Sequence, residues 1–167
     1  ACKMQNNVPT GMLWNRVTTE GCDVIDGAVG TYPNLTRTFL PVACQHCENP
    51  ACVKVCPVGA TYKDPETGVV RQDYDKCIGC RMCMAACPYQ VRTRNSKTGE
   101  VDKCRFCTLS SYENGTKMCS CVDACLTGAR IFGDLDDSDS EISKEIARTG
   151  AAPIAGDLTR AKIYYVR

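Results

Sequence analysis

Twelve consecutive residues decide the fold: Cys77-Ile78-Gly79-Cys80-Arg81-Met82-Cys83-Met84-Ala85-Ala86-Cys87-Pro88. Their spacing is C-x2-C-x2-C-x3-C-P without a gap. Three thiolates on one tight loop can reach three irons of a [4Fe–4S] cube, and the three-residue step turns the chain into a short helix that directs the fourth thiolate to a neighbouring cluster. The proline then ends the ligand loop because its ring fixes φ. Zinc typically takes two separate Cys-x2-Cys pairs, so the run predicts [4Fe–4S] clusters.

The cysteine content of the whole chain favours metal over disulfides. The chain has 15 cysteines in 167 residues, a density at which a short secreted protein would be interpreted as a disulfide scaffold. An odd number leaves one thiol over, however, and the cysteines stand in tight groups, whereas disulfides usually join distant segments. A zinc or disulfide scaffold is therefore the less favoured alternative.

Charge and the other residue types exclude several function classes. The formal net charge of +1 gives no reason to expect nucleic acid or an anionic membrane surface as partner. No apolar run approaches the roughly 18 residues of a membrane span, so no direct span is expected. No signal peptide is recognisable either. One histidine allows no Ser/His/Asp set, and no Gly-rich nucleotide loop follows a strand pattern, so we expect no substrate site and no catalytic residue.

Two further cysteine motifs flank the central run. The upstream motif has the same logic with a longer middle step, and the downstream motif is interrupted by a thirteen-residue loop. Reciprocal sharing of the fourth cysteine between adjacent motifs assigns two clusters. Cluster A takes Cys44, Cys47, Cys52 and Cys87, and cluster B takes Cys77, Cys80, Cys83 and Cys56.

An internal repeat connects the cysteine motifs. Residues 56–77 and 87–104 each run from a cysteine through two short apolar pieces and a Gly-containing turn to the next cysteine, and a third copy begins at Cys125. We expect a β-hairpin from each copy. Outside the repeat, we expect a helix over 142–148 after an acidic, serine-containing stretch, and strands over 13–17 and 161–166.

Several polar residues stand beside the cysteines. His46 lies between two closely spaced cysteines, which favours a hydrogen-bonding role near a cluster over direct ligation of iron. Four cations adjoin cysteines and could either raise cluster potentials or form an ordinary solvated face: Lys76, Arg81, Lys103 and Arg105.

A specific resemblance emerges at this point. His46-Cys47-Glu48-Asn49-Pro50-Ala51-Cys52, followed by Cys77-Ile78-Gly79-Cys80 and Cys87-Pro88-Tyr89, resembles the four-cluster iron–sulfur subunit of the dimethyl sulfoxide reductase family of molybdenum and tungsten oxidoreductases. Polysulfide, tetrathionate and dimethyl sulfoxide reductases, transhydroxylases and catechol dehydroxylases belong to that family. The resemblance implies a relay of single electrons to or from a large catalytic subunit bearing a bis-pyranopterin cofactor, with a membrane anchor subunit or a soluble donor at the other end.

The resemblance also implies the remaining ligands. The family's first motif ends in a stretch similar to Ala1-Cys2-Lys3-Met4, so cluster C would take Cys104, Cys107, Cys121 and Cys2. Cluster D would have Cys125 and would need three cysteines upstream of Ala1. Cys119 is an alternative to Cys121, and Cys22 is expected to be a free thiol. Three [4Fe–4S] clusters would then be complete from this chain.

The fold implied is α+β, with tandem intertwined bacterial-ferredoxin-like modules of short helices and β-hairpins around the clusters and a small extra β-rich segment. Four segments are expected: residues 1–40 with the end of the first motif and an insertion, 41–93 with two clusters, 94–133 completed by the N-terminal segment, and 134–167 as a tail on the core or a partner. A freestanding polyferredoxin is the alternative function. Location stays open between the cytoplasm and an extracytoplasmic complex, with membrane association through a partner.

Overall fold

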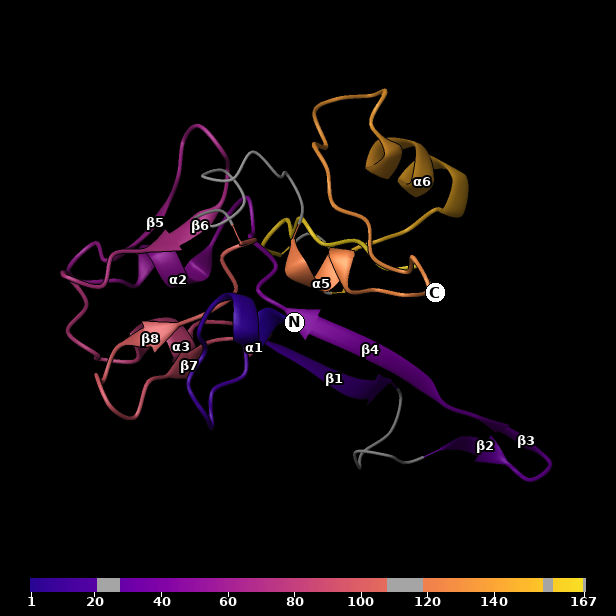
Figure 1. Ribbon diagram of the computed structural model, residues 1–167, viewed down its shortest axis with the longest axis horizontal. Helices are drawn as coiled ribbons and strands as arrows, with labels where there is room; N and C mark the ends of the chain where they lie inside the picture. Colours follow the sequence, from indigo (N-terminus) through magenta and orange to yellow (C-terminus); the bar gives the residue numbers. More distant parts are fainter. Residues whose placement is uncertain (21–27, 108–118, 155–157, 167) are drawn as a thin grey trace.

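The cysteine motifs form very short helices. The computed structural model describes residues 1–20, 28–107, 119–154 and 158–166 (Figure 1). Four helices have four residues each and each contains one cysteine: α1 (Cys2–Gln5), α2 (Ala51–Lys54), α3 (Met82–Ala85) and α5 (Ser120–Asp123). The helix predicted within the three-residue step between cysteines is therefore confirmed for α2, α3 and α5.

Two antiparallel hairpins follow the cysteine motifs. Strands β5 (Thr61–Lys63) and β6 (Val70–Gln72) form the first, and β7 (Thr93–Arg94) and β8 (Val101–Asp102) form the second. Both were predicted from the repeat. The hairpin predicted after Cys125 is wrong, because residues 126–133 contain no strand. The acidic stretch that follows offers no second apolar strand to pair with them.

A long ribbon extends from the cysteine-rich body (Figure 1). Strand β1 (Asn15–Glu20) pairs antiparallel with β4 (Thr38–Ala43), and the small hairpin of β2 (Val29–Thr31) and β3 (Asn34–Thr36) lies at its far end. The strand predicted over 13–17 overlaps β1 but begins two residues too early. The base of β4 is buried, and it leads directly into the first cysteine of the upstream motif.

The C-terminal region contributes one regular helix. Helix α6 (Glu141–Thr149) is capped by the Ser140 hydroxyl, which accepts from the Ser143 N–H at 3.3 Å, and it ends at Gly150 in the left-handed conformation. This predicted helix is confirmed. The strand predicted over 161–166 is wrong, since that segment forms only an isolated bridge between Ala152 and Tyr165.

Residues 161–166 form no strand because the tail binds the upstream ligand loop instead of another strand. The Glu48 and Asn49 N–H groups donate to the carbonyls of Arg160 and Thr159, and the Lys162 N–H donates to the Gln45 carbonyl. Of these tail groups, the Lys162 N–H belongs to the predicted strand, and the loop already uses it. Among the described residues, none of the helices is both long enough and apolar enough to span a membrane.

The buried core is small and surrounds cysteines. One group of buried residues contains Val42, Cys44, Tyr89, Val91 and Ala161, with Cys47, Cys87 and Cys104 packed against it. A second contains Val8, Met12 and Trp14, packed against Cys2 and Cys104. Short helices, short hairpins and a cysteine-lined core are compatible with a ferredoxin-like [4Fe–4S] domain.

Candidate metal centre

Four cysteines from three loops and helices line one cavity, which we name site B. Cys56 follows α2, Cys77 and Cys80 lie in the loop before α3, and Cys83 lies within α3. The four cysteines thus border one shared hollow.

Four other cysteines line a second cavity, named site A. They are Cys44, Cys47, Cys52 and Cys87. Gln45, Tyr89 and Arg92 contribute to the same lining. The eight cysteines assigned to clusters A and B from the spacing therefore gather four and four around two cavities.

Two packed helices connect these sites in opposite directions. Helix α2 carries Cys52 of site A and is followed by Cys56 of site B, while α3 carries Cys83 of site B and is followed by Cys87 of site A. Helices α2 and α3 contact each other. Because one helical turn rises about 5.4 Å, a step of four residues carries the second thiol to the next site.

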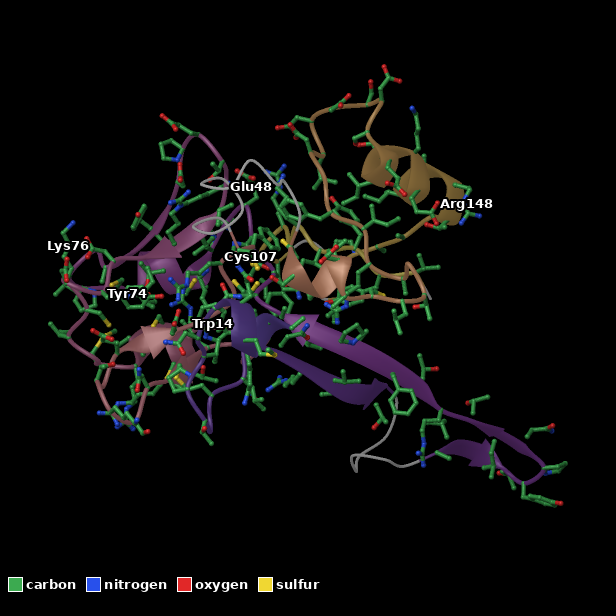
Figure 2. All side chains as sticks on the ribbon, viewed as in Figure 1. Trp14, Glu48, Tyr74, Lys76, Cys107 and Arg148 are labelled. Carbon is green, nitrogen blue, oxygen red and sulfur yellow. The ribbon has the colours of Figure 1, made fainter. Side chains whose placement is uncertain are left out.

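A third group of cysteines, named site C, joins the two ends of the described chain. Helix α1 contacts α5, and the thiol of Cys2 lies near those of Cys107, Cys121 and Cys104. Figure 2 shows Cys107 in the middle of the molecule. Cys104 also packs against the buried group around Cys44, so sites A and C are neighbours.

The Cys107 thiol is surrounded by hydrogen-bond donors. A hydrogen bond from the Cys119 thiol, joined by others from Asn6 and Ser120, outweighs burial and lowers the pKa of Cys107 to about 4. Asn6 Nδ2 donates to the Cys107 sulfur at 3.5 Å. Since the thiolate is the form that binds metal, this environment favours a metal ligand. Burial instead raises the pKa of Cys104 to about 12.

Cys125 has the same local environment as Cys56 of site B. Burial raises the pKa of the Cys56 thiol, but N–H groups of Thr61, Val58 and Ala60 outweigh it and hold that pKa below its ordinary value. The Thr127 hydroxyl, with N–H groups of the following turn, lowers the pKa of Cys125 in the same way. Cys125 thus stands in a thiolate-stabilising turn without three neighbouring cysteines in the described residues.

Two buried cations lie between the sites. The Lys103 side chain is 0 % exposed, and its Nζ donates to the carbonyls of Val70 and Cys104. Its charge acts on Cys52 of site A and Cys104 of site C. The Arg92 side chain is 4 % exposed, and its guanidinium donates to the Cys52 sulfur at 3.1 Å.

In the part of the chain that the structure describes, neither Lys103 nor Arg92 forms an ion pair with a carboxylate. A buried cation costs several kcal/mol unless an anion compensates it. A [4Fe–4S]²⁺ core with four thiolates carries about −2. The buried cations, the cavities and the all-cysteine donor sets therefore fit [4Fe–4S] clusters.

A single metal ion fits less well. Among the described residues, no three His, Cys, Asp or Glu side chains gather closely enough to hold one ion. The cysteines of sites A and B instead surround space, an arrangement suited to a group in which each iron takes its own thiolate. This arrangement disfavours the zinc alternative.

His46 hydrogen-bonds within the core between two site A cysteines. Its Nδ1 accepts from the Val70 N–H at 3.1 Å, and its ring stacks on Phe106 with the ring centroids 3.7 Å apart. Burial, together with the Lys103 charge, holds the pKa of His46 well below its ordinary value, so the ring is neutral. The ring therefore takes part in a hydrogen bond within the protein, and its role near a cluster stays a prediction.

Charged residues beside the cysteine motifs differ in location. Lys76 is exposed and pairs with Asp73 at 2.9 Å, and Arg81 is also exposed. Arg105 lies 4.6 Å from the ring centroid of Trp14, which is itself buried. Lys103 is buried.

The sequence pointed to these four cations but not to Arg92, which follows a buried valine and adjoins no cysteine in the sequence. Cys22 lies outside the described residues.

Fold and site together define a protein that holds iron–sulfur clusters on cysteine thiolates. The chain belongs to the 4Fe-4S dicluster domain family, whose model matches residues 35–135. It is 49 % identical over 169 residues to the iron-sulfur subunit of a putative dimethyl sulfoxide reductase of Halobacterium salinarum, covering 87 % of this chain and 63 % of the relative. It is 44 % identical over 146 residues to a sulfite dehydrogenase subunit of Allochromatium vinosum, with 85 % and 58 % covered.

A third relative is the thiosulfate reductase electron transfer subunit PhsB of Salmonella typhi, 41 % identical over 162 residues, with 92 % of this chain and 81 % of the relative covered. The chain thus spans about three fifths of the length of the first two relatives and about four fifths of the third. The resemblance predicted from the cysteine motifs is confirmed. These relatives are named as subunits of oxidoreductases.

Proposed function

We propose that this chain is an electron-transfer subunit that relays single electrons through [4Fe–4S] clusters to or from a molybdenum or tungsten catalytic subunit. The observation that carries the proposal is the gathering of eight cysteines, four and four, around two cavities joined by the packed helices α2 and α3. The names of the relatives support a subunit of a complex rather than a freestanding carrier.

The ligands proposed for each cluster follow the three sites. Cys44, Cys47, Cys52 and Cys87 would hold cluster A; Cys56, Cys77, Cys80 and Cys83 cluster B; Cys2, Cys104, Cys107 and Cys121 cluster C. When bound, each cluster supplies one-electron redox chemistry. The contact of α1 with α5 supports a second module completed by the N-terminal segment, in an intertwined arrangement with the first.

The protein's own groups prepare the sites for that role. Hydrogen bonds to thiolates and burial are means by which a protein adjusts a cluster's reduction potential. The donors around Cys107 and the turn around Cys56 supply the hydrogen bonds. Arg92 and Lys103 supply positive charge at the junctions of site A with site B and of site A with site C. We infer the order B, A, C for the relay.

A fourth cluster and the outer partners extend the proposal. The turn that stabilises the Cys125 thiolate supports this residue as a ligand of cluster D, with its other ligands upstream of Ala1. A membrane anchor subunit or a soluble donor would exchange electrons at the end of the relay opposite the catalytic subunit.

Anaerobic purification followed by iron, sulfide and zinc analysis tests the proposal. We expect about twelve irons and as many sulfides per chain, four for each of three clusters. Cys52→Ser and Cys83→Ser should each lose one reduced-cluster signal in electron paramagnetic resonance and slow reduction of a co-purified catalytic subunit. Cys22→Ser, at a cysteine without ligand spacing, is the control. Zinc without sulfide would refute the proposal, as would full electron throughput in a variant lacking cluster A or B.

A further inference from the structure

Arg92 places a guanidinium at the boundary between sites A and B. It precedes β7, and its Nη2 donates to the sulfur of Cys52 in site A at 3.1 Å. Its Nη1 donates to Thr61 Oγ1 at 3.3 Å and to Gln72 Oε1 at 3.2 Å. Thr61 and Gln72 line the cavity of site B. The side chain therefore spans from one cavity to the other.

The same guanidinium also acts on a cysteine of site B. Its charge and a side-chain hydrogen bond also reach the Cys83 thiol of that site. Cys44 of site A lies within the range of the same charge. One buried cation thus interacts with the proposed ligands of two clusters.

The hairpin of β5 and β6 fixes Arg92 in this position. The Thr61 hydroxyl donates to Gln72 Oε1 at 2.7 Å, directly across the two strands, and both residues accept from the guanidinium. Thr61 and Gln72 are both neutral, so they do not compensate the charge of the guanidinium. That charge is therefore available to the clusters. The planar fork of arginine can serve two acceptors at once, whereas a lysine ammonium is a single point of charge.

We propose that Arg92 is a positioning residue that sets the reduction potentials of clusters A and B together, which rests on the proposed function. Each reduction takes one electron from the donor and changes a cluster's charge from about −2 to about −3, with no bond made or broken. A cation shared by both clusters favours the added electron on either one.

Anaerobic redox titration with dithionite, followed by electron paramagnetic resonance, tests this inference. Cys52→Ser and Cys83→Ser identify the signals of clusters A and B. In Arg92→Met we expect iron and sulfide to stay at the wild-type level. The equilibrium constant for reduction should fall about tenfold at both clusters, a shift of about 59 mV for a one-electron couple. Cluster C should keep its potential.

Two further variants make the test decisive. Arg94→Met removes an exposed arginine two residues away, whose Nε donates to the Gly99 carbonyl, and should shift neither potential. Arg92→Lys keeps the charge but not the fork that reaches both sites, so the potentials of clusters A and B should shift by different amounts. If Arg92→Met loses iron, the potentials of Arg92→Lys decide whether the inference holds. Unchanged potentials, or a shift at one cluster alone in Arg92→Met, would overturn the inference. A wild-type protein without clusters would instead refute the proposed function.

Discussion

At the scale of single residues, Cys119 and Cys121 are the two candidates for one ligand position. Cys119 is the N-cap of α5 with φ −77°, and Pro50 is the N-cap of α2 with φ −78°. Cys119 therefore occupies the place of a residue that cannot be a ligand in the upstream copy. The single proton of its thiol can be directed at the Phe106 carbonyl, 3.0 Å from the sulfur, or at the Cys107 sulfur. Cys121 occupies the place of Cys52, within the helix.

This correspondence predicts different outcomes for two alanine variants. Cys121→Ala should lose about four irons per chain, because it would remove a proposed ligand of cluster C. Cys119→Ala should keep its iron and shift only the potential of cluster C, since it removes a hydrogen-bond donor near Cys107. Iron analysis and redox titration of both variants check this. The opposite pattern of iron loss would assign the ligand to Cys119.

Residue types and spacing could predict the cysteine sets, because each set is built from short motifs whose geometry is local. The sequence singled out Lys103 because it stands beside Cys104, but neither the burial of Lys103 nor the role of Arg92 could be predicted in the same way. Lys103 and Arg92 become neighbours of Cys52 only when the second hairpin folds against the first motif. Nothing in the sequence around a charged residue shows that its partner will be a thiol 40 positions away.

At the scale of elements, one turn recurs three times after a cysteine. The third residue after Cys56, Cys87 and Cys125 donates its N–H to that cysteine's carbonyl. These residues have left-handed backbones: Gly59 at φ 62°, Gln90 at φ 50° and Gly128 at φ 64°. A side chain at such φ costs about 1–2 kcal/mol, so the turn after Cys87 is the strained copy.

A reciprocal pair of substitutions measures that strain. Gly59→Gln should lower the free energy of unfolding by about 1 kcal/mol, because a Cβ there meets no atom within 4 Å and only the backbone cost remains. Gln90→Gly should change it by less, since relief of strain is offset by the greater freedom of glycine in the unfolded chain. The midpoint of thermal cluster loss at one scan rate checks this, with about 2–4 °C expected for Gly59→Gln. An unchanged midpoint in Gly59→Gln would contradict this explanation.

Some helices and strands are determined by residues close to them in the sequence, and others by contacts with residues far away in the sequence. The short helices, both hairpins and α6 were predictable, because their caps, turns and spacing lie within about a dozen residues. The ribbon of β1 and β4 was not, since Asn15 pairs with Ala43 across a long insertion. The strand predicted in the tail was wrong because its partners are also distant in the sequence. Glu48 pairs with Lys63 and, at 3.2 Å, with Lys162, which ties the tail to a distant loop.

At the scale of the whole molecule, the clusters would reverse the sign of the charge. The formal value of +1 treats every thiol as neutral. Three clusters at about −2 each would bring the loaded chain to roughly −5. The buried core has few apolar residues and includes proposed ligands, so the clusters are also expected to act as its centre.

Removal of iron should therefore unfold the cysteine-rich body. Anaerobic chelation is expected to abolish the protection of amides in β5, β6 and around α2 and α3, because no apolar core replaces the lost clusters. Helix α6 and the hairpin of β2 and β3 lie away from these sites and serve as internal controls (Figure 1). Hydrogen exchange followed by mass spectrometry checks this. Retained protection in the body would show that the apolar contacts suffice.

Helix α2 leads from site A to site B and α3 leads back from site B to site A, which limits how the chain could be cut or its gene duplicated. The pair Cys52 and Cys56 gives one cysteine to each site, and so does the pair Cys83 and Cys87. A cut anywhere between residues 57 and 76 would leave two fragments, neither with a complete set of four. If the two sites hold clusters as proposed, a duplicated gene segment would have to carry both sites to add a complete one.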